Sequence, residues 1–341
     1  MRDERNYSLK AHNTFGIDAK CSRFIEFEDD EEAIKVAKIL RESDTPYIII
    51  GGGSNLLLTK DFDGIVVRSQ LMGIVLVSRE AQPTGTVSVN CGSGEVWDDV
   101  VAYCVKQGWY GMENLSLIPG DVGASAVQNI GAYGVEAKDL IVSVEAVEIA
   151  TGQMVIISGK DCGYGYRQSK FKQEWKNRYL ITRVTYQLST SFQPHLDYGN
   201  IRQELERKGI TEPTAQQVRD IIIDIRNAKL PDPKVMGNAG SFFMNPIVTR
   251  QKYENLAALY PDMPHYNVDA RHEKIPAGWM IEQCGWKGKS LGRAGVHNKQ
   301  ALVLVNRGGA TGAEIVALSD AIRQDVQEKF DIDIHPEVNI V

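Results

Sequence analysis

Residues 111–134 have the sequence GMENLSLIPGDVGASAVQNIGAYG, in which many glycines and small residues stand among a few apolar anchors. This stretch predicts a ligand-binding segment around which the rest of the chain folds. The glycines at 120, 123, 131 and 134 permit positive φ and a close approach of the backbone, and residues 124–126 are all small. Backbone N–H groups exposed in this way form a hollow that suits an anion. A pair of tight turns around a short helix is the alternative interpretation, and this stretch alone does not separate the two.

A second glycine loop, Gly51-Gly52-Gly53-Ser54-Asn55, favours the binding interpretation. It follows the apolar run 47–50, which predicts a strand, and it precedes three leucines at 56–58. Two glycine loops of this kind in one chain indicate a ligand that carries a diphosphate.

Composition narrows the class of protein. A chain of 341 residues is long enough for two or three domains with a well-buried core. The net charge of −6 offers no basic field for nucleic acid, and no apolar run approaches the roughly 20 residues of a membrane span. The charged residues 1–5 are not typical of a secretory signal. We therefore expect a cytoplasmic protein that binds neither nucleic acid nor membrane.

Cysteines and histidines give no sign of a metal site or a disulfide framework. The five cysteines are widely spaced without a C-x-x-C pair, and the six histidines include no pair at i, i+4. We expect reduced thiols and no metal.

Hydrophobic periodicity predicts an α+β protein. Helical spacing appears in residues 31–40, 95–107, 214–228 and 311–330, and capping-box pairs stand at Thr214 with Gln217 and Thr311 with Glu314. Strand patterns occupy residues 47–50, 65–67, 71–77, 86–90, 142–149, 154–158, 179–188 and 337–341, and the middle of the chain predicts a largely antiparallel sheet. A polar loop covers residues 189–198, and Lys-Leu-Pro-Asp-Pro at 229–233 predicts a linker.

The common nucleotide motifs are absent. The G-x-G runs at 92 and 163 lack the last glycine of the dinucleotide fingerprint, and Gly288-Lys289-Ser290 lacks the first glycine of a P-loop. Ser241 follows Gly240 on a predicted tight turn, but it is not in a G-x-S-x-G elbow, so it is not an acyl nucleophile.

Six motifs together resemble the UDP-N-acetylenolpyruvoylglucosamine reductase (MurB) family over nearly the whole chain, in the branch with a mobile tyrosine loop. They are the Gly51–Asn55 loop, Ile118-Pro119-Gly120 with Gly123-Ala124, residues 128–134, Tyr166-Arg167-Gln168-Ser169, residues 237–246, and Pro336-Glu337. The resemblance implies an α+β chain with the FAD-binding fold of the vanillyl-alcohol-oxidase type. Two FAD-binding subdomains, 1–70 and 71–228, would precede a C-terminal substrate-binding domain, 229–341.

The implied reaction is part of peptidoglycan synthesis, and therefore of cell wall biogenesis, cell shape and cell division. NADPH would reduce non-covalently bound FAD, and UDP-N-acetylglucosamine enolpyruvate would then take hydride at its vinyl carbon to give UDP-N-acetylmuramate. Arg167 would stabilise the enolate-like carboxylate through a bidentate contact, and Ser241 would give the proton to the α-carbon. Glu337 would assist in a protonated form, because a second carboxylate there would repel the first.

The resemblance also implies binding residues. FAD would contact Gly51, Gly52, Gly53, Ser54, Asn55, Pro119, Gly120, Gly123, Ala124, Gln128, Asn129 and Gly131. The nucleotide sugar would contact Tyr133, Tyr198, Arg226, Lys229, Asn245, Tyr266, Lys287 and Gln300. The protein is expected to be a monomer whose partners are this nucleotide sugar and NADPH. Met244 departs from the family, which often has a basic residue at that position, so nucleotide binding is expected to depend more on Lys229 and Lys287.

Two other functions remain open at this stage. The chain could be an FAD-dependent oxidase or dehydrogenase of another alcohol or sugar, although no His or Cys stands in a recognisable motif for covalent flavin attachment. It could also be a non-catalytic protein that binds flavin or nucleotide sugar. Such a binding protein would not need Arg167, Ser241 and Glu337 in their implied roles.

Overall fold

The computed structural model describes residues 1–77 and 83–341, and this part of the chain divides into two compact units. Unit 1 comprises residues 1–7, 21–52 and 63–228, and unit 2 comprises residues 8–20, 53–62 and 229–341. Unit 2 thus includes residues 8–20 and 53–62, which the sequence analysis places in the first subdomain. The predicted domain bounds, with divisions after residues 70 and 228, stay a prediction.

The first sheet of unit 1 has four strands in the order β1-β2-β5-β3, and the end residues of three of these strands belong to unit 2. The strands are β1 (Arg2–Ser8), β2 (Lys20–Phe27), β5 (Phe62–Ser69) and β3 (Tyr47–Ile50), with β3 parallel to β5. Helix α1 (Asp30–Arg41) starts after Asp29, whose side chain accepts a hydrogen bond from the Glu32 N–H. The predicted helix and the predicted strand at 47–50 are thus confirmed.

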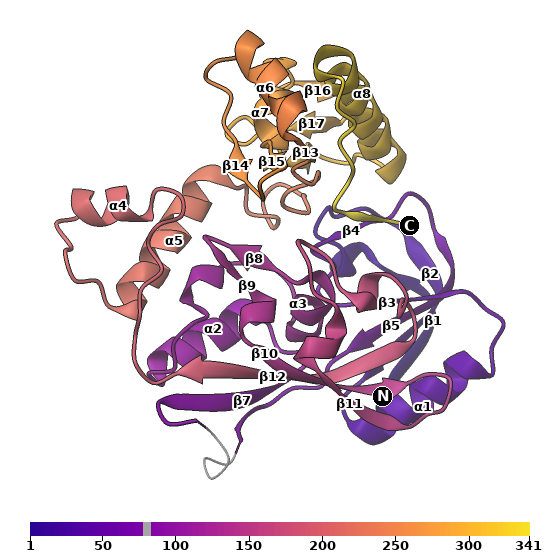
Figure 1. Ribbon diagram of the computed structural model, residues 1–341. Coiled ribbons are helices and arrows are strands. Elements are labelled where there is room, and N and C mark those ends of the chain that lie inside the picture. Colours follow the sequence, from indigo (N-terminus) through magenta and orange to yellow (C-terminus); the bar gives the residue numbers. More distant parts are fainter. Residues whose placement is uncertain (78–82) are drawn as a thin grey trace. The chain divides into compact units, whose positions relative to one another are not determined.

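The second sheet of unit 1 is antiparallel throughout, with the strand order β11-β10-β12-β7-β6. Strands β7, β12, β10 and β11 of this sheet are labelled in Figure 1. Its strands are β11 (Met154–Ser158), β10 (Ile141–Glu148), β12 (Tyr179–Ser189), β7 (Thr86–Gly92) and β6 (Ile74–Leu76). The predicted antiparallel sheet is confirmed, although the strand predicted over 71–77 is limited to three residues. Helices α2 (Trp97–Lys106) and α3 (Val122–Gln128) share one apolar core with β7, β10 and β12.

Two further helices complete unit 1 and form a satellite core. Helices α4 (Ile201–Arg207) and α5 (Ala215–Lys229) pack together, with Tyr133, Phe192 and Leu196 against them. The predicted capping box is confirmed, because the Thr214 N–H donates to Gln217 Oε1 at 2.9 Å and the Gln217 N–H donates to Thr214 Oγ1 at 3.2 Å. A partly buried ion pair joins α5 to α2, in which Arg219 Nη1 and Nη2 donate to the two carboxylate oxygens of Asp98 at 2.6 and 2.9 Å.

Short elements fill the connections. Strands β8 (Gly131–Ala132) and β9 (Val135–Glu136) form a small antiparallel hairpin. Short 3-10 helices occupy Lys10–His12, Glu113–Leu115, Ala137–Asp139, Gly159–Cys162 and Lys170–Lys172.

Unit 2 contains two three-stranded sheets and one two-stranded sheet. Strands β13 (Ile247–Thr249), β15 (His272–Lys274) and β14 (Tyr266–Asn267) form one, and β16 (Ser290–Leu291), β17 (Ala294–Val296) and β18 (Leu304–Asn306) form another. Of the strand predicted over 337–341, only β19 (Asn339–Ile340) forms, and it pairs in parallel with β4 (Leu56–Leu57).

Three helices surround these sheets within unit 2: α6 (Arg250–Leu259), α7 (Ala277–Gln283) and α8 (Gly312–Phe330). The capping box predicted at Thr311 and Glu314 is present at the start of α8. In the described ranges, no helix combines the length and the apolar character that crossing a bilayer requires.

Candidate functional site

Two glycine segments lie side by side in unit 1. A Cβ atom built on Gly52 would lie 3.4 Å from the Gly120 Cα and 3.0 Å from Asp121 Oδ1. A Cβ atom built on Gly51 would lie 3.2 Å from the Ala124 Cβ. The start of the Gly51–Asn55 loop therefore packs on residues 120–124, and a side chain at residue 51 or 52 would force these neighbours to shift. Glycines at such a contact let the backbones approach closely, and the predicted role of both segments in FAD binding stays a prediction.

Asp121 adds a charged group that sequence reasoning missed. Its side chain is 4% exposed, and Arg68 Nη2 lies 3.6 Å from its Oδ2. Burial raises the pKa of this carboxyl to about 6, and the charge of Arg68 works in the opposite direction. Asp121 is the N-cap residue of α3, but its side chain makes no capping bond.

Asn129, which is predicted to contact FAD, forms several hydrogen bonds inside the protein. It ends α3 with a φ of 44°, and its side chain is fully buried. Its Nδ2 donates to the Gly165 carbonyl at 2.7 Å, and its Oδ1 accepts from the Lys138 N–H at 3.0 Å. These bonds give Asn129 a structural role, since they attach the turn that carries Arg167 to the end of α3. Its contact with FAD stays a prediction.

Arg167 is held in a strained turn. Its φ is 55°, a left-handed value that is uncommon for a residue with a side chain, and Gly165 and Gln168 close the turn with two backbone hydrogen bonds of 3.0 and 3.1 Å. Arg167 Nη2 donates to the Gly131 carbonyl at 2.6 Å, and Lys172 Nζ donates to the Arg167 carbonyl at 3.1 Å. The guanidinium is therefore fixed against the β8–β9 hairpin, as a charge-stabilising group requires.

The Arg167 side chain leaves too little space for a side chain at residue 131, which explains the glycine there. A Cβ atom at residue 131 would lie only 2.8 Å from Arg167 Nη1. The glycine that the sequence assigns to the cofactor bed thus also makes room for the guanidinium.

The polar loop at 189–198 packs on the same hairpin. Asn114 Nδ2 donates to the Tyr133 carbonyl and to the His195 carbonyl, each at 2.9 Å, so one buried amide connects the two segments. A Cβ atom on Gly134 would lie 3.5 Å from the Tyr198 Cβ, and one on Gly199 would lie 3.4 Å from the Tyr133 ring. The structure thus brings Tyr133 and Tyr198 together, with 42% of Tyr198 exposed.

Arg226 of α5 belongs to the same neighbourhood. In the ranges that the structure describes, its buried Nε has no hydrogen-bond partner. Burial lowers the pKa of this guanidinium, the tyrosine at 133 and Asp98 raise it, and Arg167 lowers it further. Two cations and two tyrosines of unit 1 thus gather around the hairpin, which suits an anionic ligand.

Ser241 and Glu337 are brought together within unit 2. The Glu337 N–H donates to the Phe242 carbonyl at 2.8 Å, and the Met244 N–H donates to the His335 carbonyl at 2.9 Å. Gly240 has a φ of 67°, and the buried rings of Phe242 and Phe243 anchor the chain directly after the exposed Ser241. The residue directly after Ser241 is thus bonded to the Glu337 backbone, so the two predicted catalytic residues lie on neighbouring segments.

Asn55 also joins this part of unit 2. Its Nδ2 donates to the Glu337 carbonyl at 3.3 Å, and its own carbonyl accepts from the Asn339 N–H at 3.1 Å. The last residue of the Gly51–Asn55 loop is therefore bonded to the segment of a predicted catalytic residue.

The other predicted substrate residues of unit 2 occupy four places. Asn245 and Gln300 lie at the start of α7, where Asn245 Oδ1 accepts from the Ala277 N–H at 2.9 Å and Gln300 Oε1 lies near Gly278. Lys287 forms an ion pair with Glu282 at 2.9 Å. Tyr266 lies on β14 and is 43% exposed, and Lys229 is exposed at the end of α5.

No metal site is evident in residues 1–77 and 83–341, since no group of three or more His, Cys, Asp or Glu side chains is placed to hold an ion.

Comparison with known proteins adds two family matches. Residues 21–158 match the model of an FAD binding domain, and residues 232–341 match the C-terminal domain of UDP-N-acetylenolpyruvoylglucosamine reductase.

Full-length relatives carry the same name. A UDP-N-acetylenolpyruvoylglucosamine reductase of Bacteroides fragilis is 56% identical over 339 residues, which cover 99% of this chain and 100% of the relative. The enzyme of that name from Pseudomonas aeruginosa is 45% identical over 337 residues, which cover 99% of this chain and 98% of the relative.

A solved structure confirms the fold. The crystal structure of UDP-N-acetylenolpyruvylglucosamine reductase (MurB) from Thermus caldophilus superposes with a TM-score of 0.67 at 22% identity, covering 100% of this chain and 99% of the other. The predicted α+β architecture with an FAD-binding fold is confirmed by this match and by the FAD-binding family model.

Proposed function

The chain belongs to the UDP-N-acetylenolpyruvoylglucosamine reductase family, and from this premise we propose that it reduces UDP-N-acetylglucosamine enolpyruvate to UDP-N-acetylmuramate. The observation that carries the proposal is the identity of 56% over nearly the full length to a reductase of that name. An FAD-dependent oxidoreductase with NADPH as reductant follows from the same relationship. Another flavin oxidase, or a non-catalytic binding protein, is not favoured, because the relatives named for this reaction match both halves of the chain.

Bound FAD, once reduced by NADPH, supplies the hydride that the vinyl carbon of the substrate receives. Arg167 has the role of stabilising the negative charge that then develops on the adjoining carboxylate. A guanidinium offers two parallel N–H donors to a carboxylate, and the turn at residues 165–168 fixes the direction of this one.

Proton delivery is assigned to Ser241 and electrostatic assistance to Glu337. Ser241 gives its hydroxyl proton to the α-carbon, so it acts as a general acid. A protonated Glu337 stabilises the developing carboxylate without adding a second negative charge. Their neighbouring segments in unit 2 support a joint assignment.

We assign binding of the UDP diphosphate to Tyr198, Lys229 and Lys287. The other proposed substrate residues are Tyr133, Arg226, Asn245, Tyr266 and Gln300. We further propose that the protein is a cytoplasmic monomer and that its product enters peptidoglycan synthesis, with consequences for cell shape and cell division.

The decisive assay follows NADPH oxidation with and without UDP-N-acetylglucosamine enolpyruvate. We expect the substrate to accelerate NADPH consumption strongly and UDP-N-acetylmuramate to appear in equal amount. A purified protein that stays colourless after FAD is added back, or that oxidises NADPH at the same rate without the substrate, would contradict the proposal.

The Tyr198→Phe variant is expected to bind the nucleotide sugar about 10- to 150-fold more weakly, because a phenolic hydrogen bond to a charged diphosphate is worth roughly 1.5–3 kcal/mol. Flavin reduction by NADPH should be preserved. Titration of the absorbance of the oxidised flavin with UDP-N-acetylglucosamine enolpyruvate, in the absence of NADPH, measures the affinity. Tyr103→Phe, which changes another exposed tyrosine of unit 1, is the matched control. Unchanged affinity in Tyr198→Phe would remove the loop from the site.

A further inference from the structure

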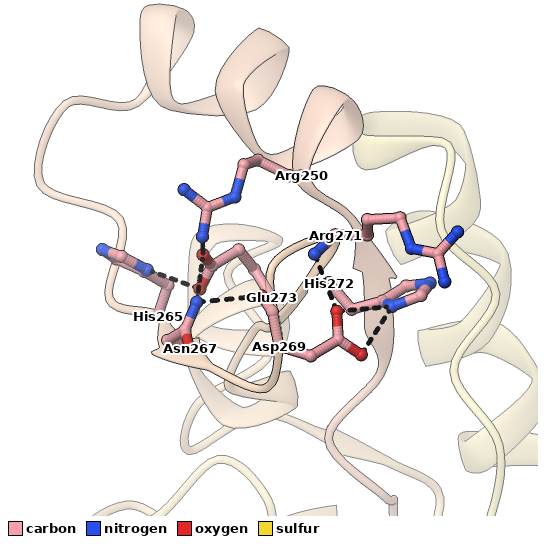
Figure 2. A network of polar contacts seen from close by, with 7 residues as sticks. All are labelled: Arg250, His265, Asn267, Asp269, Arg271, His272 and Glu273. Atoms are coloured by element: carbon pink, nitrogen blue, oxygen red, sulfur yellow. Dashed lines mark hydrogen bonds and ion pairs between the residues drawn. The ribbon is translucent and has the colours of Figure 1, made fainter.

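A buried carboxylate lies directly behind a predicted substrate residue in unit 2. Glu273 is on β15, the central strand of the β13-β15-β14 sheet, and its side chain is only 3% exposed. Its Oε1 accepts from Arg250 Nη2 at 2.9 Å and from Asn267 Nδ2 at 3.1 Å, and its Oε2 lies 3.1 Å from His265 Nδ1 (Figure 2). Three partners thus satisfy a charge that would be costly to bury alone.

Two of these partners are the residues on either side of Tyr266. Along a strand, successive side chains point to opposite faces, and residues opposite each other on antiparallel strands share a face. Asn267 pairs with Glu273 in the ladder, and Tyr266 pairs with Lys274. When Asn267 turns toward the buried carboxylate, Tyr266 is turned to the other face.

That other face is exposed and carries an aromatic ring with a cation. Tyr266 is 43% exposed, and Lys274 Nζ lies 5.6 Å from the centroid of its ring, within cation–π range. Ile247, which pairs with Lys274 across the sheet, is 49% exposed on the same face.

Strand β14 depends on such side-chain contacts because it is only two residues long and lies at the edge of its sheet. Few backbone hydrogen bonds hold a strand of this length. His265 is also fixed from a second side, since its ring lies 4.2 Å from that of Tyr253 on α6. The hydrogen bond from His265 is the largest cause that lowers the pKa of the Glu273 carboxyl. The charged carboxylate is therefore the form that holds His265 and Asn267.

We propose that Glu273 is a positioning residue for nucleotide-sugar binding, which anchors His265 and Asn267 so that the Tyr266 ring is presented to the nucleotide in one orientation. The inference rests on the proposed function, which assigns Tyr266 to the substrate. Glu273 itself touches no substrate, and it acts through the strand.

The Glu273→Gln variant tests the proposal in the holoenzyme. The glutamine amide has an NH₂ group in place of one carboxylate oxygen, so it cannot accept hydrogen bonds from all three donors. With pre-reduced enzyme mixed rapidly with the enolpyruvyl substrate, we expect the apparent Kd to rise five- to tenfold and the limiting rate of flavin reoxidation to stay within twofold. If Glu273→Gln folds poorly, Asn267→Ala provides a second test. It removes one donor and leaves the carboxylate paired with Arg250, and it should also raise the apparent Kd.

A control and a double variant separate positioning from general damage. Asp269→Asn weakens the contact of Asp269 with His272 in the same hairpin and removes no bond to Glu273, so its Kd should match wild type. In a Tyr266→Ala background, Glu273→Gln should raise the Kd no further, because both changes act through one ring.

Three results would overturn the proposal: full additivity with Tyr266→Ala, an unchanged Kd in Glu273→Gln, or an equal rise in Asp269→Asn. Failure of the proposed function would look different, since reduced wild-type enzyme would then not be reoxidised by the enolpyruvyl substrate at any concentration.

Discussion

The Ser241→Ala variant is expected to reduce its flavin with NADPH at nearly the wild-type rate and to reoxidise it with the enolpyruvyl substrate about 10²–10⁴-fold more slowly. The hydroxyl has no part in hydride delivery from NADPH, but the substrate half-reaction requires a proton at the α-carbon. Rapid-mixing absorbance at the flavin bands measures the two half-reactions separately.

The structure makes this substitution a clean test. The chain at this point is held by Phe242 and Phe243, whose buried rings meet edge to face at 5.1 Å, and by the Phe242 N–H, which donates to the Leu302 carbonyl at 2.8 Å. Removing one exposed hydroxyl group leaves these anchors intact. The free energy of unfolding should therefore change by no more than about 0.5 kcal/mol, as for an ordinary surface substitution.

Ser290→Ala provides the matched control, because Ser290 is another exposed serine of unit 2 that no role in the reaction involves. Both half-reactions should stay at the wild-type rate in this control. If Ser241→Ala slows both half-reactions equally, the serine is not the general acid and acts on the flavin site as a whole.

Local sequence signals predicted α1, α2, α5 and α8 and the capping boxes of α5 and α8, but they did not predict the short helices α4 and α7. The capping boxes at Thr214 and Thr311 depend on residues three positions apart, so the spacing alone is sufficient. Strand ends were less predictable, since the length of a strand is set by its partner. Residues 71–77 have one apolar pattern, but only Ile74–Leu76 pair with β7.

The assignment of single residues in the site was only partly accessible from the sequence. The resemblance supplied Arg167, Ser241 and Glu337, and no spacing rule would have connected Ser241 with a residue almost one hundred positions later. Hydrogen bonds from polar side chains to backbone carbonyls were missed: Asn129 to Gly165, Lys172 to Arg167, and Asn114 to His195. A buried asparagine gives no periodic signal, because its partners are fixed by tertiary packing.

Replacing Arg167 by lysine is expected to slow flavin reoxidation by the enolpyruvyl substrate about 10²–10³-fold, while NADPH reduces the flavin at close to the wild-type rate. This is the size of effect seen when one preorganised donor to a developing oxyanion is removed. Lysine keeps the positive charge, but an ammonium group lacks the planar fork that binds a carboxylate through two parallel hydrogen bonds. The lost contact is specific to the state in which charge has developed, so the limiting rate should fall more than the substrate affinity.

Arg178→Lys is a closely matched control, because Arg178 is also an arginine of unit 1 beside a tyrosine, and its Nε and Nη2 meet Glu148 Oε1 at 3.0 and 2.8 Å. Both half-reactions should be unaffected in that variant. The strained turn at Arg167 offers a second check, since lysine must adopt the same φ of 55° with its carbonyl still held by Lys172. A fall in substrate affinity without a fall in the limiting rate would show that Arg167 only binds the ground state, and the charge-stabilising role would have to be abandoned.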